Sequence, residues 1–358
     1  RSGRKLFSGS CFSANTWGHQ ACGFSISTFV SLERQAAKCT GVKPEGRCRF
    51  TCLVLGYGWK SHPKARVFRE TFTTYFKIIS TFRRSDDFEN AIEAWKRARD
   101  RFATYKVNKK QTMPPLISEV DEEQLINTRC IHGPFSVVIA YLLYLGWVPF
   151  ALNVWIDHTK TKWTIDDGSR SSEEIISAII ERSNFLDQQV AALHYGGNGI
   201  QLGIDHELSF AWHRSKSISY TDRCTIETIH CGGCWPNLRV HQIHPEVSPI
   251  CFRCGQAPDD ALHCFWTCPC NANIDSVDVQ TTQKLIPAAV AKYATETCLW
   301  LRGIVPLSWS QEALDRIIEN RTKTEVIVTV CDEGISPSFC GKFTIYGDAS
   351  GGKYTKYP

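Results

Sequence analysis

The sequence of 358 residues lacks several features that would assign a protein to a class at once. Its one methionine is Met113, so it does not begin with the initiator residue. No apolar run approaches the roughly 20 residues that a membrane-spanning helix needs. The basic start, "RSGRKLFSGSCFS", lacks the apolar core of a secretory signal. We therefore expect an intracellular protein, nuclear or cytoplasmic, that is not secreted and has no membrane partner.

Neither end of the sequence has the form of a natural terminus. The chain starts without methionine, and its last residues, "GDASGGKYTKYP", follow directly on a strand-like run. We expect the sequence to be an internal piece of a longer chain.

Two familiar catalytic motifs are also absent. No Gly-x-Ser-x-Gly turn occurs, which sets aside hydrolases with a serine nucleophile on such a turn. No aromatic-x-Asp-Asp hairpin of a polymerase occurs either. The adjacent Asp86 and Asp87 stand instead in the first turn of a predicted helix.

Acidic residues are scarce in the first part of the chain. Up to Arg84 there are 15 Lys and Arg residues and three acids, a net charge of +12; because the whole chain carries +5, the remainder carries −7. Aromatic residues lie among these charges, namely Trp17, Phe24, Phe29, Phe50, Tyr57 and Trp59. Such a segment either follows a phosphate backbone or forms a solvated basic surface that binds nothing specific.

The spacing of apolar residues predicts a mainly α fold with short β hairpins. Ser85 is the expected N-cap of one helix, a cap starts the amphipathic helix (or pair of helices) at 171–195, and Gly146 ends a third. Alternating residues around a Lys-Thr-Lys turn predict a hairpin. Helices are expected at 64–82, 85–106, 133–150, 171–195, 206–230, 281–300 and 310–320, the hairpin at 151–169, and a strand at 323–330.

Cysteine, in contrast, is abundant. The chain has 17 cysteines at irregular spacing and no export signal, which favours metal ligation or free buried thiols over a disulfide framework. The segment "CFRCGQAPDDALHCFWTCPCN" (251–271) has the spacing Cys251-x2-Cys254-x8-His263-x4-Cys268. Two thiolates from one tight turn, closed by a second pair, suit a tetrahedral zinc ion. Gly255 lets the backbone curl round the metal, and Asp259 and Asp260 are expected to cap the helix that carries His263.

Two alternatives to this ligand set remain open at this point. The cysteines can be ordinary small core residues of a helical protein that binds neither metal nor nucleic acid. A second Cys-x2-Cys pair, Cys231 and Cys234, can also join Cys251 and Cys254 in a four-cysteine ribbon. Cys264 and Cys270 are spare thiols in the first assignment.

The segment 233–271 resembles the zinc-knuckle segment that follows the polymerase in non-LTR (LINE-like) retrotransposon polyproteins. Phe252 stands where that family usually has proline, a change expected to affect the turn and not the ligation. Cys231 and Cys234 do not belong to the ligand pattern of the family. The residues that carry the resemblance are Trp235-Pro236, Arg239, Cys251-Phe252-Arg253-Cys254-Gly255, Asp259-Asp260, His263, Phe265-Trp266 and Cys268-Pro269.

The resemblance implies a structural zinc ion and a segment that helps to hold template nucleic acid. The expected partner is RNA, DNA or an RNA–DNA hybrid. The two aromatic residues beside the zinc turn either stack on bases or form the core of the knuckle. The residues expected to bind nucleic acid are Arg239, Arg253, Phe265 and Trp266.

A second resemblance lies near the end of the sequence. "KFTIYGDASGGKYT" (342–355) is similar to the first strand of a ribonuclease H domain, in which Asp348 is the first metal-binding aspartate. The family follows this aspartate with Gly-Ser, whereas this chain has Ala349-Ser350. Two Mg²⁺ ions held by several carboxylates cleave the RNA strand in such enzymes, and one carboxylate is not enough. The remaining acids would lie after Pro358, so the chain alone is expected to catalyse nothing.

The expected protein is therefore a fragment of a reverse transcriptase and ribonuclease H polyprotein. The rival expectation is a host protein, derived from such an element, that binds nucleic acid through zinc without catalysis. The expected regions are a basic thumb-like or connection-like region (1–107), a linker (108–132), a helical connection (133–224), the zinc-knuckle region (225–271), a helical linker (272–322), and the start of a truncated α/β ribonuclease H-like domain (323–358).

Overall fold

The computed structural model describes residues 2–104, 126–165 and 171–309. The helix and strand expected at 310–330, and the ribonuclease H strand with Asp348, lie outside the described residues. The chain divides into two compact units, unit 1 with Arg1–Val42 and Arg49–Gln188 and unit 2 with Lys43–Cys48 and Gln189–Pro358. Among the described residues, no helix combines the length and the apolarity that crossing a membrane requires.

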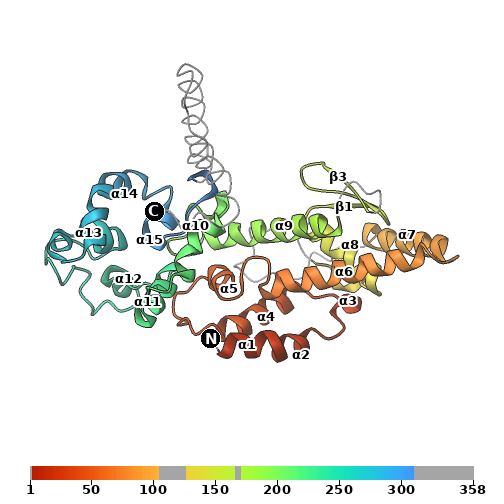
Figure 1. Cartoon of the computed structure of the whole chain (residues 1–358), viewed down its shortest axis with the longest axis horizontal. Coiled ribbons are helices and arrows are strands. Elements are labelled where there is room, and N and C mark those ends of the chain that lie inside the picture. Colours follow the sequence, from red (N-terminus) through yellow and green to blue (C-terminus); the bar gives the residue numbers. More distant parts are fainter. Residues whose placement is uncertain (1, 105–125, 166–170, 310–358) are drawn as a thin grey trace, which may run out of the picture. The chain divides into compact units, whose positions relative to one another are not determined.

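The described part is mostly helical with one small antiparallel sheet, as the sequence predicted in general terms (Figure 1). The helix α9 (Ser172–Ala192) starts in unit 1 and ends in unit 2. The other helices of unit 1 are α1 (Ser2–Leu6), the π-helical η1 (Phe7–Cys11), α2 (Phe12–Thr16), α3 (His19–Cys22), α4 (Ile26–Lys38), α5 (Arg49–Tyr57), α6 (Pro63–Phe82), α7 (Phe88–Thr104), the 3₁₀ turn η4 (Thr128–Cys130) and α8 (Pro134–Tyr144).

The helix predicted at 64–82 forms the centre of unit 1. Helix α6 starts with Pro63 in its first turn, where a missing N–H costs nothing. The residues on its inner face are fully buried, among them Phe68, Phe72 and Tyr75. They pack on aromatic rings from α4, α8 and the sheet, with the Phe68 and Tyr141 ring centroids 5.0 Å apart. Truncation of such a ring to alanine typically costs about 3–5 kcal/mol, so this aromatic core stabilises unit 1 strongly.

The sheet of unit 1 has the strand order β1-β2-β3, with β1 (Val148–Ala151), β2 (Val154–Ile156) and β3 (Lys162–Thr164). Trp155 and Trp163 stand opposite each other in the predicted hairpin. The first strand was not expected, because 133–150 was assigned to a helix ended by Gly146 and no strand was predicted after that glycine. Gly146, with a φ of 74°, ends α8 as predicted, and the chain then turns into β1.

Two helix starts test the predicted caps. The N-cap at Ser85 was wrong: Ser85 Oγ donates to Phe82 O at the end of α6, and the first helical hydrogen bond of α7 runs from Ala91 N to Asp87 O. The cap before α9 is confirmed. Glu174 N donates to Ser171 Oγ and Ser171 N donates to Glu174 Oε2, which is a complete capping box.

Unit 2 consists of short elements joined by turns. Cys48 N donates to Cys231 O at 2.6 Å and ties the segment 43–48 to the rest of the unit. Its helices are the 3₁₀ turn η5 (Ile200–Leu202), α10 (His206–Phe210), the 3₁₀ turn η6 (Ala211–Arg214), α11 (Tyr220–His230), α12 (Asn237–His241), the π-helical η7 (His263–Thr267), the 3₁₀ turns η8 (Pro269–Asn273) and η9 (Gln283–Leu285), α13 (Val277–Thr282), α14 (Ile286–Lys292) and α15 (Thr297–Arg302).

Candidate metal centre

The Cys-x2-Cys pair lies on a tight turn in unit 2. Ile250 and Pro258 form an isolated antiparallel bridge at the base of this turn. Inside it, Cys251 N donates to Ala257 O and Gly255 N donates to Cys251 O, each at 2.8 Å. Gly255 has a φ of 66°, a conformation that side chains beyond glycine rarely adopt. The backbone thus curls round the two thiols as the sequence predicted.

His263 begins the π-helical turn η7. Asp260 Oδ1 accepts a hydrogen bond from His263 N at 2.7 Å, so Asp260 caps this turn as predicted. Asp259 has a different partner, because its Oδ2 accepts from Asn237 N at the start of α12. The prediction that Asp259 caps the helix with His263 is therefore wrong, and Asp259 caps α12 instead.

Cys268 follows directly after η7. Its N–H donates to His263 O at 2.8 Å, which fixes the separation of the last two candidate ligands along the backbone. The 3₁₀ turn η8 begins at the next residue, Pro269. All four candidate ligands are thus carried by two short turns rather than by long helices.

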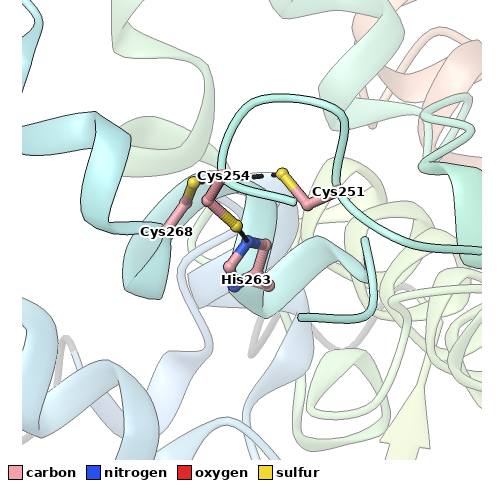
Figure 2. A group of neighbouring side chains, drawn as sticks. All are labelled: Cys251, Cys254, His263 and Cys268. Carbon is pink, nitrogen blue, oxygen red and sulfur yellow. Dashed lines mark hydrogen bonds between the residues drawn. The ribbon is translucent and has the colours of Figure 1, made fainter. Parts of the chain in front are cut away.

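The four predicted side chains point toward one another (Figure 2). Their ligand atoms all lie within 4.8 Å of one another. Cys251 Sγ and Cys268 Sγ are 4.0 Å apart, and Cys254 Sγ and His263 Nε2 are 3.3 Å apart. A tetrahedral zinc ion with Zn–S of about 2.3 Å and Zn–N of about 2.0 Å places sulfurs ~3.8 Å apart and sulfur and nitrogen ~3.5 Å apart. The spacing therefore fits a metal ion, and it is too long for a disulfide bond.

The cluster combines buried side chains with hydrogen bonds from the backbone. Cys251, Cys268 and His263 are buried. The N–H groups of Cys254 and Arg253 point at the Cys251 thiol and lower its pKa, and those of Gln256 and Ala257 lower the pKa of Cys254. Burial raises the pKa of Cys268 to about 11. The turn thus favours the thiolate form at two of the three cysteines, which is the form that binds metals.

The alternative four-cysteine ribbon does not form. In residues 2–104, 126–165 and 171–309, the group of side chains that can hold a metal ion joins Cys251 and Cys254 to His263 and Cys268. Cys231 is buried at the end of α11, and burial raises the pKa of Cys234. Cys264 and Cys270 lie close by without joining the cluster: Cys270 Sγ donates to Arg253 O at 3.2 Å.

Three of the four residues predicted to bind nucleic acid make internal contacts. Arg239 donates to Gly232 O and Cys234 O, and its guanidinium lies 3.9 Å from the ring centroid of Tyr195. Arg253 donates to backbone and side-chain oxygens beside the cluster.

Trp266 is half-buried, donates to Trp300 O and packs edge-on against the Trp300 ring. Phe265, the fourth predicted residue, is 40% exposed.

Phe252 is an exposed residue of the site that the sequence analysis did not select. It lies between two candidate ligands, and 82% of its surface is exposed. The signal was present in the sequence, because an aromatic residue stands here where the family that the segment resembles usually has proline. A zinc turn is too small to bury such a ring, so the side chain faces solvent.

Comparison with known proteins adds no relationship: no protein family, no curated protein and no solved structure matches the chain. The structure itself supports a mostly helical chain with a cluster of Cys251, Cys254, His263 and Cys268 that can bind a metal ion such as zinc. Asp348, the predicted magnesium ligand and catalytic residue, lies outside the described residues.

Proposed function

We propose that residues 225–271 form a zinc-dependent nucleic-acid-binding module of a retrotransposon-type polyprotein. One observation carries the proposal. The four residues that match the knuckle motif lie together with donor atoms at tetrahedral spacing, within 4.8 Å of one another. The resemblance to the knuckle motif supports nucleic-acid binding, and the arrangement of the four side chains supports metal binding.

Zinc is the ion that best fits the donors. Three thiols and one imidazole are soft or borderline ligands, and four protein ligands close a tetrahedron without an open position for a substrate. We therefore assign the ion a structural function. Residues 251–271 bury few side chains outside the cluster, Ala261 and Asn271 among them, so the bound ion supplies folding free energy that an apolar core would otherwise supply.

Exposed aromatic rings provide the proposed contact with nucleic acid. Phe252 and Phe265 lie on the two turns that carry the ligands, and both are exposed. An aromatic ring that stacks on a base contributes about 1–3 kcal/mol, with little preference for sequence. The guanidinium groups of Arg239 and Arg253 already hydrogen-bond within the protein. We therefore expect binding to single strands that is weak and has a shallow salt dependence, because few phosphates are contacted.

The test is binding of the whole chain, loaded with one equivalent of zinc, to a fluorescent single-stranded RNA or DNA oligonucleotide, followed by anisotropy. Phe252→Ala and Phe265→Ala should each weaken binding roughly tenfold, as the loss of one stacked base implies. Phe150→Ala is the matched control, because Phe150 is an exposed ring of unit 1. Removal of zinc with a chelator should abolish the contribution of both rings. Equal binding by the chelated chain and by both variants would overturn the proposal.

The parent polyprotein is proposed to copy RNA into DNA and to cleave the RNA strand of the hybrid. This part of the proposal rests on the resemblance at 342–355, with Asp348 as one of several acids that hold Mg²⁺. The chain alone should leave an RNA–DNA hybrid intact in Mg²⁺. Cleavage that Asp348→Asn abolishes would show instead that the chain carries a complete nuclease site.

A further inference from the structure

Arg253 lies inside the Cys-x2-Cys turn and binds both of the other parts of the knuckle. Its Nη1 donates to Asn271 Oδ1 at 2.7 Å, and its Nη2 donates to Cys264 O at 2.6 Å. Asn271 is buried and donates weakly to the same Cys264 carbonyl at 3.4 Å. One guanidinium thus joins the zinc turn, the turn η7 that carries His263, and the turn η8 that follows Cys268.

We propose that Arg253 is a positioning residue of the metal centre, which fixes the Cys251-x2-Cys254 turn against the segment with His263 and Cys268 and balances the charge of the loaded site. This inference rests on the proposed metal centre and is independent of nucleic-acid binding. It gives Arg253 a function different from the nucleic-acid binding that the resemblance implied.

Charge explains why an arginine is suited to this place. Three thiolates and one neutral imidazole around Zn²⁺ leave a net charge of −1 in a largely buried cluster. Buried charge without a partner is costly, and a guanidinium beside the sulfurs offsets it. Its planar fork reaches two oxygen acceptors at once, which the single ammonium of lysine does not reproduce.

Geometry explains why the same side chain holds the ligands in place. The two ligand pairs come from separate turns, and the ligand atoms of a metal site bind well only when their supporting groups hold them. In the knuckle, Arg253 is one of the side chains that hydrogen-bond across these turns. It extends from the first turn and donates to a backbone carbonyl of the second. Loss of this link should leave each turn intact and make their relative placement less fixed.

The experiment compares zinc affinities of whole chains by competition with a chromophoric chelator. Arg253→Gln should weaken zinc binding roughly 10- to 100-fold, the range seen when groups that support metal ligands are removed. Arg253→Lys should fall between Arg253→Gln and the wild type, because it keeps the charge and loses the fork. The control is Arg223→Gln in the same unit, since Arg223 also donates to two backbone carbonyls, those of His213 and Ser215. That variant should bind zinc as the wild type does.

Two further readouts separate this inference from others. The absorption spectrum of the Co²⁺-loaded chain should remain tetrahedral in Arg253→Gln at saturating metal, which shows that the variant still folds. At saturating zinc, Arg253→Gln should bind the oligonucleotide as tightly as the wild type. Zinc affinity within threefold of the wild type, or loss of oligonucleotide binding by the zinc-saturated variant, overturns the positioning function. A wild-type chain that binds no zinc overturns this inference together with the metal centre, whatever the oligonucleotide result.

Discussion

Unit 1 and unit 2 each bury a cluster of polar side chains, and the two clusters are balanced in different ways. In unit 1 the cluster consists of Glu33, Arg49, Lys64, Tyr144 and Asp187, which we call the charge cluster. Lys64 Nζ lies 2.8 Å from both Tyr144 Oη and Asp187 Oδ1, and Arg49 Nε lies 3.0 Å from Glu33 Oε2. Each carboxylate of this cluster has a protein cation beside it.

The metal centre of unit 2 has the opposite composition. Three thiols and one imidazole lie together in this cluster. The deprotonated thiols and the neutral imidazole are electron-pair donors, which is the form in which these groups bind a metal ion. The protein contributes one cation to this group, Arg253. The comparison separates two kinds of buried polar cluster. A cluster that places a cation beside each of its carboxylates is a structural network, whereas three thiols and an imidazole with a single cation beside them form a group that can hold a metal ion.

Removal of the metal should therefore have the largest effect and should act on unit 2 alone. A structural zinc site contributes about 10–16 kcal/mol of apparent binding free energy at neutral pH, which is comparable to the whole stability of a typical domain. With a chelator, or in Cys251→Ser or His263→Ala, residues of about 245–272 should unfold and one zinc ion per chain should be lost. Elemental analysis gives the zinc content, and peptide-resolved hydrogen exchange should show unchanged protection in α6. Unchanged metal content in both variants would mean that the ligand assignment is wrong.

Removal of the cation from the charge cluster should have the next largest effect, now confined to unit 1. Lys64→Met leaves Asp187 and Glu33 with less compensation in a buried place, which typically costs about 3–5 kcal/mol. Slower-exchanging amides of α6 should lose protection by a corresponding amount in native-state hydrogen exchange. Lys77→Met, on an exposed position of the same helix, is the control.

A double variant distinguishes the loss of charge pairing at Lys64 from the loss of side-chain packing. Asp187→Asn added to Lys64→Met should recover part of the stability, because the uncompensated carboxylate is then gone. A double variant that is as unstable as the sum of the two single variants would show that Lys64 acts by packing rather than by charge.

The comparison also explains which cluster the sequence could predict. The four candidate metal ligands lie within 18 residues, so their spacing alone indicated the cluster and its donor atoms. The charge cluster joins α4, α5, α6, α8 and α9, and Lys64 and Asp187 are 123 positions apart. No local pattern contains that pairing, and the cluster could not be predicted.

The same division holds for the rest of the fold. Helix α6, the hairpin and the capping box of α9 follow from local periodicity and local hydrogen bonds, and they were predicted. Strand β1 was missed, because an apolar run such as "VPFA" has no strand period of its own and becomes a strand by pairing with β2. Tyr195, whose ring lies beside the Arg239 guanidinium, and Trp300, the partner of Trp266, both lie outside the motif, so these two internal contacts were not foreseen.

The stability of unit 1 should depend on pH through Glu33 of the charge cluster. Burial and the nearby Asp187 raise the pKa of Glu33 from 4.5 to about 7, although Lys64 and Arg49 act in the opposite direction. Between these values the folded chain holds a proton that the unfolded chain has released, so the stability of unit 1 should fall as the pH rises from about 5 to 7. A shift of this size corresponds to about 3 kcal/mol.

Urea unfolding of the wild type and of Glu33→Gln across this pH range measures the effect. Glu33→Gln should remove the contribution of Glu33 to the slope of stability against pH, while Glu93→Gln, at an exposed acid, should keep it. Burial lowers the pKa of His19 and of His62, so these residues add stability that is lost as the pH falls below 6.5. Both histidines are present in the wild type and in the variant, so they cancel in the difference between the two. Equal slopes in the two proteins would show that Glu33 ionises in the folded chain as it does in the unfolded one.

The smallest expected effect lies in the metal centre, at the cap of the turn that carries His263. Asp260→Ala removes the acceptor of the His263 N–H, and the loss of such a cap typically costs about 1 kcal/mol, which equals a roughly fivefold weaker zinc affinity. Asp260→Asn keeps an acceptor and should bind zinc as the wild type does. The effect is small because the zinc ion holds His263 from the other side, whereas nothing replaces Lys64 in the charge cluster. If Asp260→Ala unfolded the knuckle even at saturating zinc, the turn and not the ion would determine its fold, and the contrast between the two clusters would fail.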